Sequence, residues 1–189
     1  MVDFSAARLN MVDSQVRTND VTDLRVQDAM RVIPREALLP PGKAFLAYAD
    51  AEVPYGPGRA LLAPRDVAKL LHALAIAPGQ KALAIAAPYG AAVLEHAGLT
   101  VERLDGDDLA SPTAGAYDII ICEGAVARTP DAWTAALAPG GRLAVIERIG
   151  PVGKAVVYTQ SPTGLARREI FDATPSYLGG FEPEQGFAF

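Results

Sequence analysis

Short apolar runs alternate with helix-like segments between residues 64 and 148, and this alternation is the strongest constraint on the fold. The runs YDIIIC and RLAVIE are almost free of polar residues. Such runs are typical of parallel strands buried on both faces, and parallel strands need crossover connections. The sequence therefore predicts an α/β fold, with strands at 81–86, 100–104, 117–122 and 142–148 and helices from Pro64 to the Pro78-Gly79 terminator, at 89–97 and at 131–137.

The two ends of the chain differ from this centre. Near the C-terminus, AVVYTQ and LARREIFDA flank the turn SPTG and predict an antiparallel hairpin. Near the N-terminus, NDVTDLRVQDAMRVIP predicts a helix capped by Asp20 or Thr22 and stopped by Pro34. The buried side of this helix is expected to carry Leu24, Ala29, Met30 and Ile33. We expect one domain over residues 1–189, with a helical and irregular arm at 1–63 and an α/β core at 64–189.

Composition narrows the classes of function. The chain has 17 basic and 22 acidic residues, a net charge of −5, and no dense basic run, so we expect no nucleic-acid partner. Cys122 is the single cysteine and the two histidines lie in separate segments, so we expect no metal site. The N-terminal sequence lacks the apolar stretch of a signal peptide, and no segment is long and uncharged enough to span a bilayer. A cytoplasmic location without membrane association is the expectation.

Five stretches of the chain stand in an order and spacing that are fairly specific to one family. They are VQDAMRVIPREALLP, AYADAEVPYGPGRALLAPRDVAKLL, KALAIAAPYGAAVL, YDIIICEGAV and LAPGGRLAVI. Together they resemble the protein-L-isoaspartate O-methyltransferase family, whose members use S-adenosylmethionine to methylate the carboxylate of damaged aspartyl residues. The resemblance implies a Rossmann-like class I methyltransferase sheet that ends in an antiparallel hairpin and carries an N-terminal helical extension.

The glycine-rich first motif of that family is altered here. The family pattern is roughly Leu-Glu-Ile-Gly-x-Gly-x-Gly-Tyr, whereas residues 83–89 read LAIAAPY. By the resemblance, this turn would hold the methionine end of the cofactor, whose ammonium needs an acid and whose carboxylate needs N–H groups at a helix start. Ala84 cannot pair with an ammonium, and Pro88 has no N–H. We expect the turn Ala86-Ala87-Pro88 to be closed, with no free pair of backbone N–H groups facing a cavity.

Two further departures concern the rest of the expected site. The interval from His96 to Tyr117 is too short for the two strands and the helix that the family places there, so we expect a sheet truncated by one strand–helix unit. The acids of LDGDD (104–108) then cannot serve both the ribose and the adenine. The family pattern Ile-Ser-x-Pro supplies a hydroxyl beside the acceptor carboxylate, and Leu62 stands at that serine position.

These losses favour a degenerate member of the family. The main hypothesis is a non-catalytic pseudo-methyltransferase without a cofactor, which binds a protein partner or a second copy of itself through the old substrate groove or the N-terminal arm. The alternative is an active S-adenosylmethionine-dependent methyltransferase acting on a protein carboxylate, with an altered cofactor pocket built from Tyr89, Asp105 and Glu123. Glu123 follows a parallel strand, at the sheet edge where ligands bind in open α/β folds. Arg35 and Arg59 are candidate anchors for a substrate carboxylate, or ordinary surface ion pairs.

Overall fold

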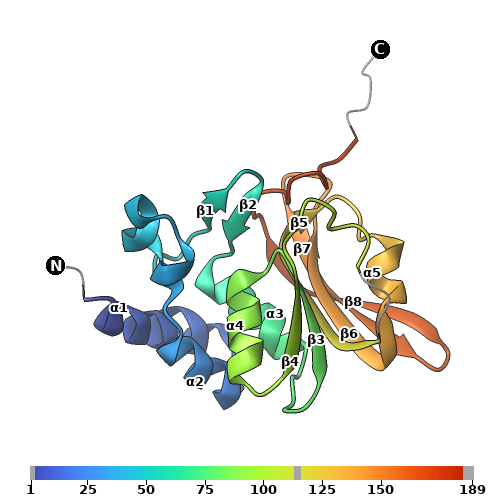
Figure 1. Cartoon of the computed structure of the whole chain (residues 1–189), viewed down its shortest axis with the longest axis horizontal. Helices are drawn as coiled ribbons and strands as arrows, with labels where there is room; N and C mark the ends of the chain where they lie inside the picture. Colours follow the sequence, from blue (N-terminus) through green and yellow to red (C-terminus); the bar gives the residue numbers. More distant parts are fainter. Residues whose placement is uncertain (1–2, 113–115, 185–189) are drawn as a thin grey trace.

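A six-stranded mixed sheet organises the molecule. The structure is a computed structural model and describes residues 3–112 and 116–184. The strands pair in the order β4-β3-β5-β6-β7-β8 (Figure 1). Their bounds are β3 Lys81–Ile85, β4 Thr100–Leu104, β5 Tyr117–Val126, β6 Leu137–Glu147, β7 Gly153–Ser161 and β8 Gly164–Ala173. The first four of these pair in parallel, while β7 and β8 are antiparallel, so the predicted α/β centre and C-terminal hairpin are confirmed.

Strand β5 continues further than the sequence predicts. The predicted strand ends at Cys122, but β5 runs on to Val126 through a register shift against β6 between Ile121 and Ala125. Gly124 lies in this shift with a φ of 145°, and a side-chain carbon there would lie 3.2 Å from Cβ of Leu178. The chain can therefore follow the C-terminal segment closely only because this residue is glycine. A glutamate and a glycine interrupt the apolar run, which is why sequence periodicity ends the strand too early.

The side of the sheet beyond β3 is short. In the part of the chain that the structure describes, β4 is the one strand on this side, paired in parallel with β3 from Lys81↔Thr100 to Ile85↔Leu104. Residues 113–115, which precede β5 in the sequence, lie outside the described residues. A single strand on this side of β3 in the described residues agrees with the expectation of a truncated sheet, and β4 is the edge strand.

Helices cover both faces of the sheet. α3 (Pro64–Ala73) and α4 (Pro88–His96) pack on one face together with the N-terminal residues, and α5 (Asp131–Ala135) packs on the other (Figure 1). Successive residues of β5 alternate between the two hydrophobic clusters, with Ile119 and Ile121 on the α4 side and Ile120 and Cys122 on the α5 side. Burial of both faces explains why the strand pattern is continuously apolar.

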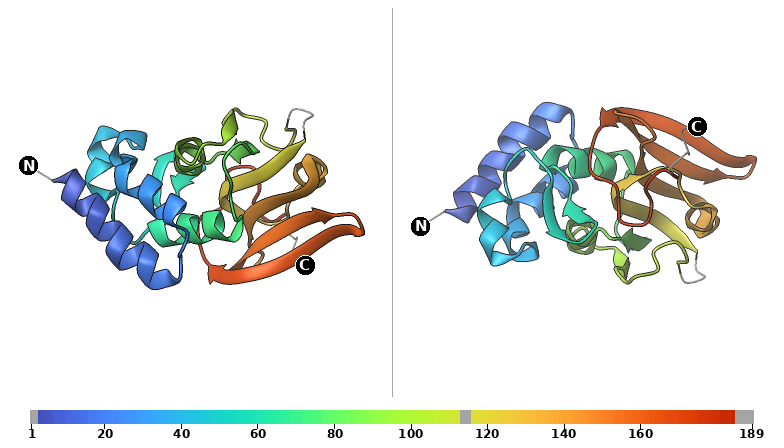
Figure 2. Two further views of the ribbon diagram at one scale, coloured as in Figure 1. Left: turned by 90° about the horizontal axis from the view of Figure 1, so that it is seen from below. Right: turned by 90° about the horizontal axis from the view of Figure 1, so that it is seen from above.

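The N-terminal region begins with helices and then becomes irregular, as predicted. α1 (Phe4–Met11) continues through a π-helical turn (Val12–Val16) and a 3-10 turn (Arg17–Asn19), and α2 (Leu24–Val32) follows. Two 3-10 helices (Arg35–Leu38, Pro41–Leu46) and a small hairpin of β1 (Val53–Gly56) and β2 (Arg59–Leu61) complete it. Figure 2 shows these helices at one end of the molecule and the β7–β8 hairpin reaching toward the other. No described helix combines the length and hydrophobicity needed to cross a bilayer.

The start of α2 differs from the prediction. Asp23, and not Asp20 or Thr22, caps the helix, because its carboxylate accepts the Arg25 N–H at 2.9 Å. Leu24, expected on the buried side, is 66% exposed, whereas Val26 is fully buried. Residues two positions apart in an α-helix point in directions about 200° apart around its axis, so these two side chains lie on nearly opposite faces.

Glu147, the last residue of β6, ties the C-terminal hairpin to the sheet. Its carboxylate accepts hydrogen bonds from the Thr129 hydroxyl at 2.6 Å, the Tyr158 hydroxyl at 2.5 Å and the Arg167 guanidinium at 2.8 Å. Burial opposes ionisation of this group, but these donors outweigh it and hold the pKa of Glu147 below its ordinary value.

The lowered pKa of Glu147 predicts a loss of stability in acid. A carboxyl whose pKa is lower in the folded state than in the unfolded state stabilises the fold fully when the pH is above its unfolded-state pKa of about 4.3. This contribution is lost as the pH falls through its folded-state pKa. We expect Glu147→Gln to lose about 1–2 kcal/mol of unfolding free energy at pH 6 and much less at pH 3. Urea unfolding at both pH values measures this, with Glu184→Gln as the control. An equal loss at both pH values would contradict the prediction.

Candidate functional site

The turn between β3 and α4 is closed by alanines, but its backbone has the conformation of a glycine. Ala86 has a φ of 45°, in the left-handed region. Its N–H donates to the carbonyl of Leu104 at 2.9 Å, and its carbonyl lies 3.5 Å from the Tyr55 hydroxyl. The turn therefore has a positive φ at an alanine, which sequence reasoning did not anticipate.

This conformation predicts an unusual stabilising substitution. A left-handed conformation costs a non-glycine residue about 1–2 kcal/mol, which a change to glycine would remove. Part of this gain is lost again, because glycine has more conformational freedom in the unfolded state. We expect Ala86→Gly to leave stability unchanged or raise the melting temperature by about 2–4 °C. Ala84→Gly, in β3 immediately before the turn, is the matched control and is expected to lower it. Thermal unfolding followed by circular dichroism measures both, and equal destabilisation by the two variants would refute the argument.

Glu123 fills the space at the start of α4. It lies in β5, is 1% exposed, and accepts the Gly90 N–H at 2.6 Å and the Leu62 N–H at 3.4 Å. A side-chain carbon at Gly90 would lie 3.3 Å from Oε1 of Glu123, so the approach is close. The helix start, where an external anion would be bound, is thus capped by a carboxylate of the chain itself. The Gly90 N–H is therefore taken by Glu123, as the Ala86 N–H is by Leu104, and the expectation of a turn without a free N–H pair stays a prediction.

Arg35 and Tyr89 complete this buried polar cluster. The Arg35 side chain is fully buried, donates to the carbonyls of Ala47 and Leu62 at 2.8 Å each, and lies 4.4 Å from the ring centre of Tyr89. The backbone of Leu62 therefore links Arg35, through its carbonyl, to Glu123, through its N–H. Burial lowers the pKa of Arg35 and raises the pKa of Glu123, while the opposite charges counteract both shifts.

The structure separates the three residues of the expected altered cofactor pocket. Tyr89 and Glu123 meet inside the protein, where burial raises the pKa of the Tyr89 phenol. Asp105, by contrast, is exposed on the loop after β4. Arg35, expected at the surface or as a substrate anchor, is instead a buried structural residue, because its guanidinium is engaged by carbonyls and an aromatic ring. Arg59 reaches the same loop as Asp105 through a 3.2 Å bond to the Gly106 carbonyl.

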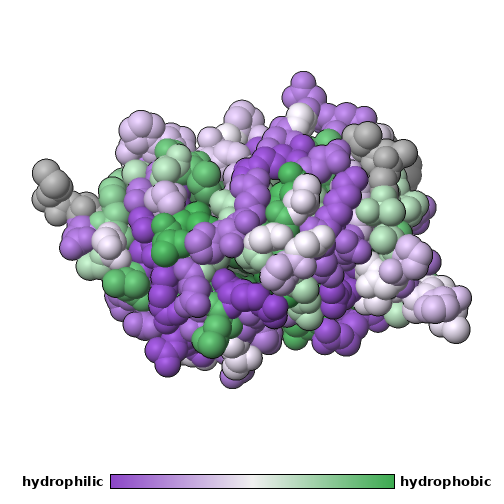
Figure 3. Space-filling view, turned by 60° about the horizontal axis from the view of Figure 1, so that its bottom comes forward, coloured by the Kyte–Doolittle hydropathy of each residue, from purple (hydrophilic) through white to green (hydrophobic). Residues whose placement is uncertain are grey.

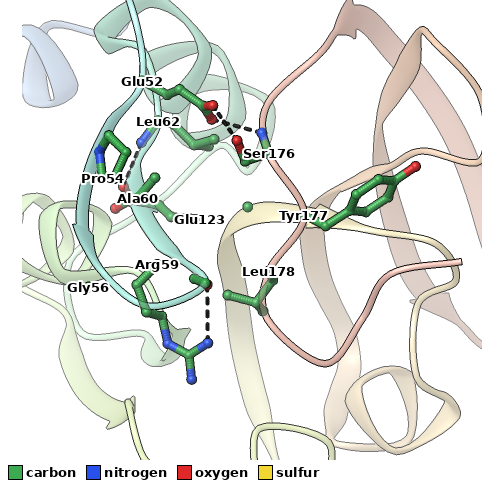
Figure 4. Close-up of a pocket in the computed structure, with 12 residues that line it drawn as sticks. Glu52, Pro54, Gly56, Arg59, Ala60, Leu62, Glu123, Ser176, Tyr177 and Leu178 are labelled. Atoms are coloured by element: carbon green, nitrogen blue, oxygen red, sulfur yellow. Dashed lines mark hydrogen bonds between the residues drawn. The ribbon is translucent and has the colours of Figure 1, made fainter.

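A pocket of about 200 Å³ lies next to this cluster. It is bounded by the β1–β2 hairpin, by the end of β5 at Glu123 and Gly124, and by residues 176–178 (Figure 4). Glu52 closes one side by accepting hydrogen bonds from the backbone N–H and hydroxyl of Ser176, and the Tyr177 ring points away from the pocket. Leu62, at the position expected for a catalytic serine, gives this pocket an apolar wall.

Known proteins resemble this chain in sequence. Residues 7–97 match the family model described as protein-L-isoaspartate(D-aspartate) O-methyltransferase. A protein-L-isoaspartate O-methyltransferase of Methylorubrum extorquens (strain PA1) is 34% identical over 92% of this chain and 87% of its own length. A relative of the same name from Methylorubrum populi is 33% identical over 90% of this chain and 92% of its own length.

Solved structures resemble it in fold. One protein-L-isoaspartate O-methyltransferase superposes with a TM-score of 0.72 and 18% identity, over 93% of this chain and 67% of the other. A putative enzyme of this kind from Plasmodium falciparum, solved in complex with S-adenosyl-L-homocysteine, gives a TM-score of 0.71 and 14% identity, over 90% of this chain and 97% of the other. The fold is therefore the Rossmann-like class I methyltransferase fold, with N-terminal helices and a C-terminal antiparallel hairpin. By its sequence similarity to these relatives, the chain belongs to the protein-L-isoaspartate O-methyltransferase family.

Proposed function

We propose that this chain keeps the methyltransferase fold without the family's reaction and acts by binding another protein. The observation that carries the proposal is the Glu123 carboxylate on the N–H of Gly90, 2.6 Å away, at the start of α4. A cofactor carboxylate at this helix start would meet a buried carboxylate that already occupies the position. Two carboxylates that compete for the same N–H would repel each other, and displacing Glu123 would expose a buried polar cluster.

Four positions bear on whether S-adenosylmethionine and an acceptor would fit. Ala84, where the family has an acid for the cofactor's ammonium, is buried and apolar. At the helix start, Pro88 has no backbone N–H, and the N–H of Gly90 donates to Glu123, so neither residue can donate to a ligand. Leu62 supplies no hydroxyl for an acceptor. The residues at these positions do not fit S-adenosylmethionine, and they provide no group that would promote methyl transfer.

An active methyltransferase is the second candidate, and the comparisons favour it. The relatives that match most of the chain carry the name of the enzyme, and the Plasmodium falciparum protein was solved with S-adenosyl-L-homocysteine. In this candidate the cofactor would bind in a pocket that includes Tyr89, Asp105 and Glu123, and the acceptor would be a protein carboxylate. Such binding would require Glu123 to release the start of α4.

Calorimetric titration with S-adenosylmethionine and S-adenosylhomocysteine separates the two candidates. Protein concentrations that detect dissociation constants of about 1 mM are needed, and the Methylorubrum extorquens relative serves as the positive control. We expect no saturable heat from this chain, while cooperative thermal unfolding of the same sample shows that it is folded. Saturable binding would overturn the proposal and favour the enzyme, and transfer of labelled methyl groups to an isoaspartyl peptide would then identify the reaction.

The N-terminal helices offer the surface for a protein partner. Large apolar side chains are exposed on this part of the molecule, and Figure 3 shows hydrophobic residues among polar ones toward its N-terminal end. These side chains include Leu9, Val32, Phe45 and Leu46, of which Phe45 is 65% exposed. Exposed apolar residues mark interaction sites in soluble proteins when they form one patch, as we propose for these side chains. Sedimentation velocity tests self-association, and Phe45→Ser is expected to weaken any association of the wild type.

A further inference from the structure

A second pocket is lined by other residues than those at the start of α4. It has a volume of about 420 Å³ and is formed by the end of the first helical segment, by α3 and by β8. These three segments lie side by side when the molecule is seen from below (Figure 2, left). Its polar lining consists of Asn19, Asp20, Lys69, His72 and Arg168. No lining residue belongs to the altered cofactor turn, so this pocket is independent of the proposed function.

The cations of this pocket form no ion pair within the described residues. Most arginines of the described chain form an ion pair or donate to a carbonyl, but neither Lys69 nor Arg168 has a carboxylate within 4.0 Å in the described residues. The ammonium of Lys69 is instead 4.4 Å from the ring centre of Phe171. Asp20 is the one acid in the lining, so the pocket carries an excess of positive charge although the whole chain has a net charge of −5.

His72 lines the same pocket. Its Nδ1 atom is buried, so this nitrogen does not face the pocket. An anion that contacts Lys69 and Arg168 would also be near this imidazole, whose other nitrogen, Nε2, can donate a hydrogen bond to it.

We propose that this pocket binds the phosphate group of a small phosphorylated molecule. Lys69 and Arg168 supply the charge, and Arg168 can present two parallel N–H groups to phosphate oxygens. His72 contributes a third donor. The pocket is larger than a bare phosphate needs, so the remaining space accommodates the organic part of the ligand next to Ile170 and Ala73.

The two histidines allow a direct test by NMR. The Hε1 signals of His72 and His96 are followed while inorganic phosphate, or glucose 6-phosphate, replaces chloride at constant pH and ionic strength. His96 is exposed at the end of α4, does not line this pocket, and reports general effects of the buffer. We expect saturable shifts at His72 alone, with the ester binding several-fold more tightly than inorganic phosphate. Equal affinities would assign the pocket to free phosphate and overturn the ester.

Charge variants of opposite sign make the test specific. Arg168→Gln is expected to weaken binding about fivefold, and Asp20→Asn to tighten it by a similar factor, because each changes one charge in a partly exposed pocket. Arg128→Gln changes the same charge at an exposed position outside the pocket and is expected to have no effect. Absence of a saturable shift at His72, equal shifts at both histidines, or insensitivity to both pocket variants would overturn the proposal.

Discussion

Replacement of Glu123 by alanine is expected to lower the free energy of unfolding by about 1–3 kcal/mol, because it leaves a buried N–H without an acceptor and removes the negative charge that acts on the buried Arg35 guanidinium. The Gly90 N–H would lose its acceptor, and Arg35 would remain fully buried among carbonyls and an aromatic ring. Urea unfolding at pH 7 measures the loss. If the variant does not fold, the midpoint for Glu123→Gln, which retains one acceptor oxygen, gives the same comparison at smaller cost.

Glu95→Ala provides the control for removing a glutamate of this region. Glu95 lies in α4, is exposed, and forms a surface pair with Arg103 at 2.9 Å. Exposed pairs contribute about 0–1 kcal/mol, so this variant should be nearly as stable as the wild type. A loss of less than 1 kcal/mol for Glu123→Ala would contradict the role of Glu123 as the cap of α4 and would remove the main support for the non-catalytic proposal.

The sheet could be predicted from the sequence because its causes are local. Apolar runs such as that of residues 117–122 encode buried parallel strands, and the turn at 161–164 encodes the hairpin. The short interval between His96 and Tyr117 limited the number of strands beyond β3. Predictions of helix caps were less successful, because Asp20, Thr22 and Asp23 are all good capping residues and the choice between them depends on tertiary packing.

The candidate site could be predicted only in part. Sequence reasoning placed Glu123 at the ligand-binding edge of the sheet, but its contact with Gly90 depends on how the end of β5 meets the start of α4. One sequence signal could have suggested this cap. It is an acid at the end of an apolar strand, when that strand pairs with the strand that leads into a helix. The burial of Arg35 had no such signal, because arginine is rarely buried and its partners are backbone carbonyls from distant loops.

Replacement of Arg35 by methionine tests the other half of the buried cluster. We expect a loss of about 1–3 kcal/mol, because methionine fills the space beside Tyr89 but removes the positive charge that acts on the buried Glu123 carboxyl. The carbonyls of Ala47 and Leu62 also lose their donors. Arg31→Met, which removes an arginine that pairs with Asp13 and Asp28 near the surface, is the control and should lose less than about 1 kcal/mol.

The double variant Arg35→Met/Glu123→Gln decides whether the two charges act together. Removing both charges leaves neither of them buried alone. The double variant should therefore lose about 1–3 kcal/mol less unfolding free energy than the two single variants lose together. Additive losses would mean that Glu123 caps α4 independently of Arg35. Coupled losses would mean that Glu123 and Arg35 form one buried cluster that connects α4, β5 and the N-terminal arm. A cofactor carboxylate could then reach the start of α4 only if this cluster were broken.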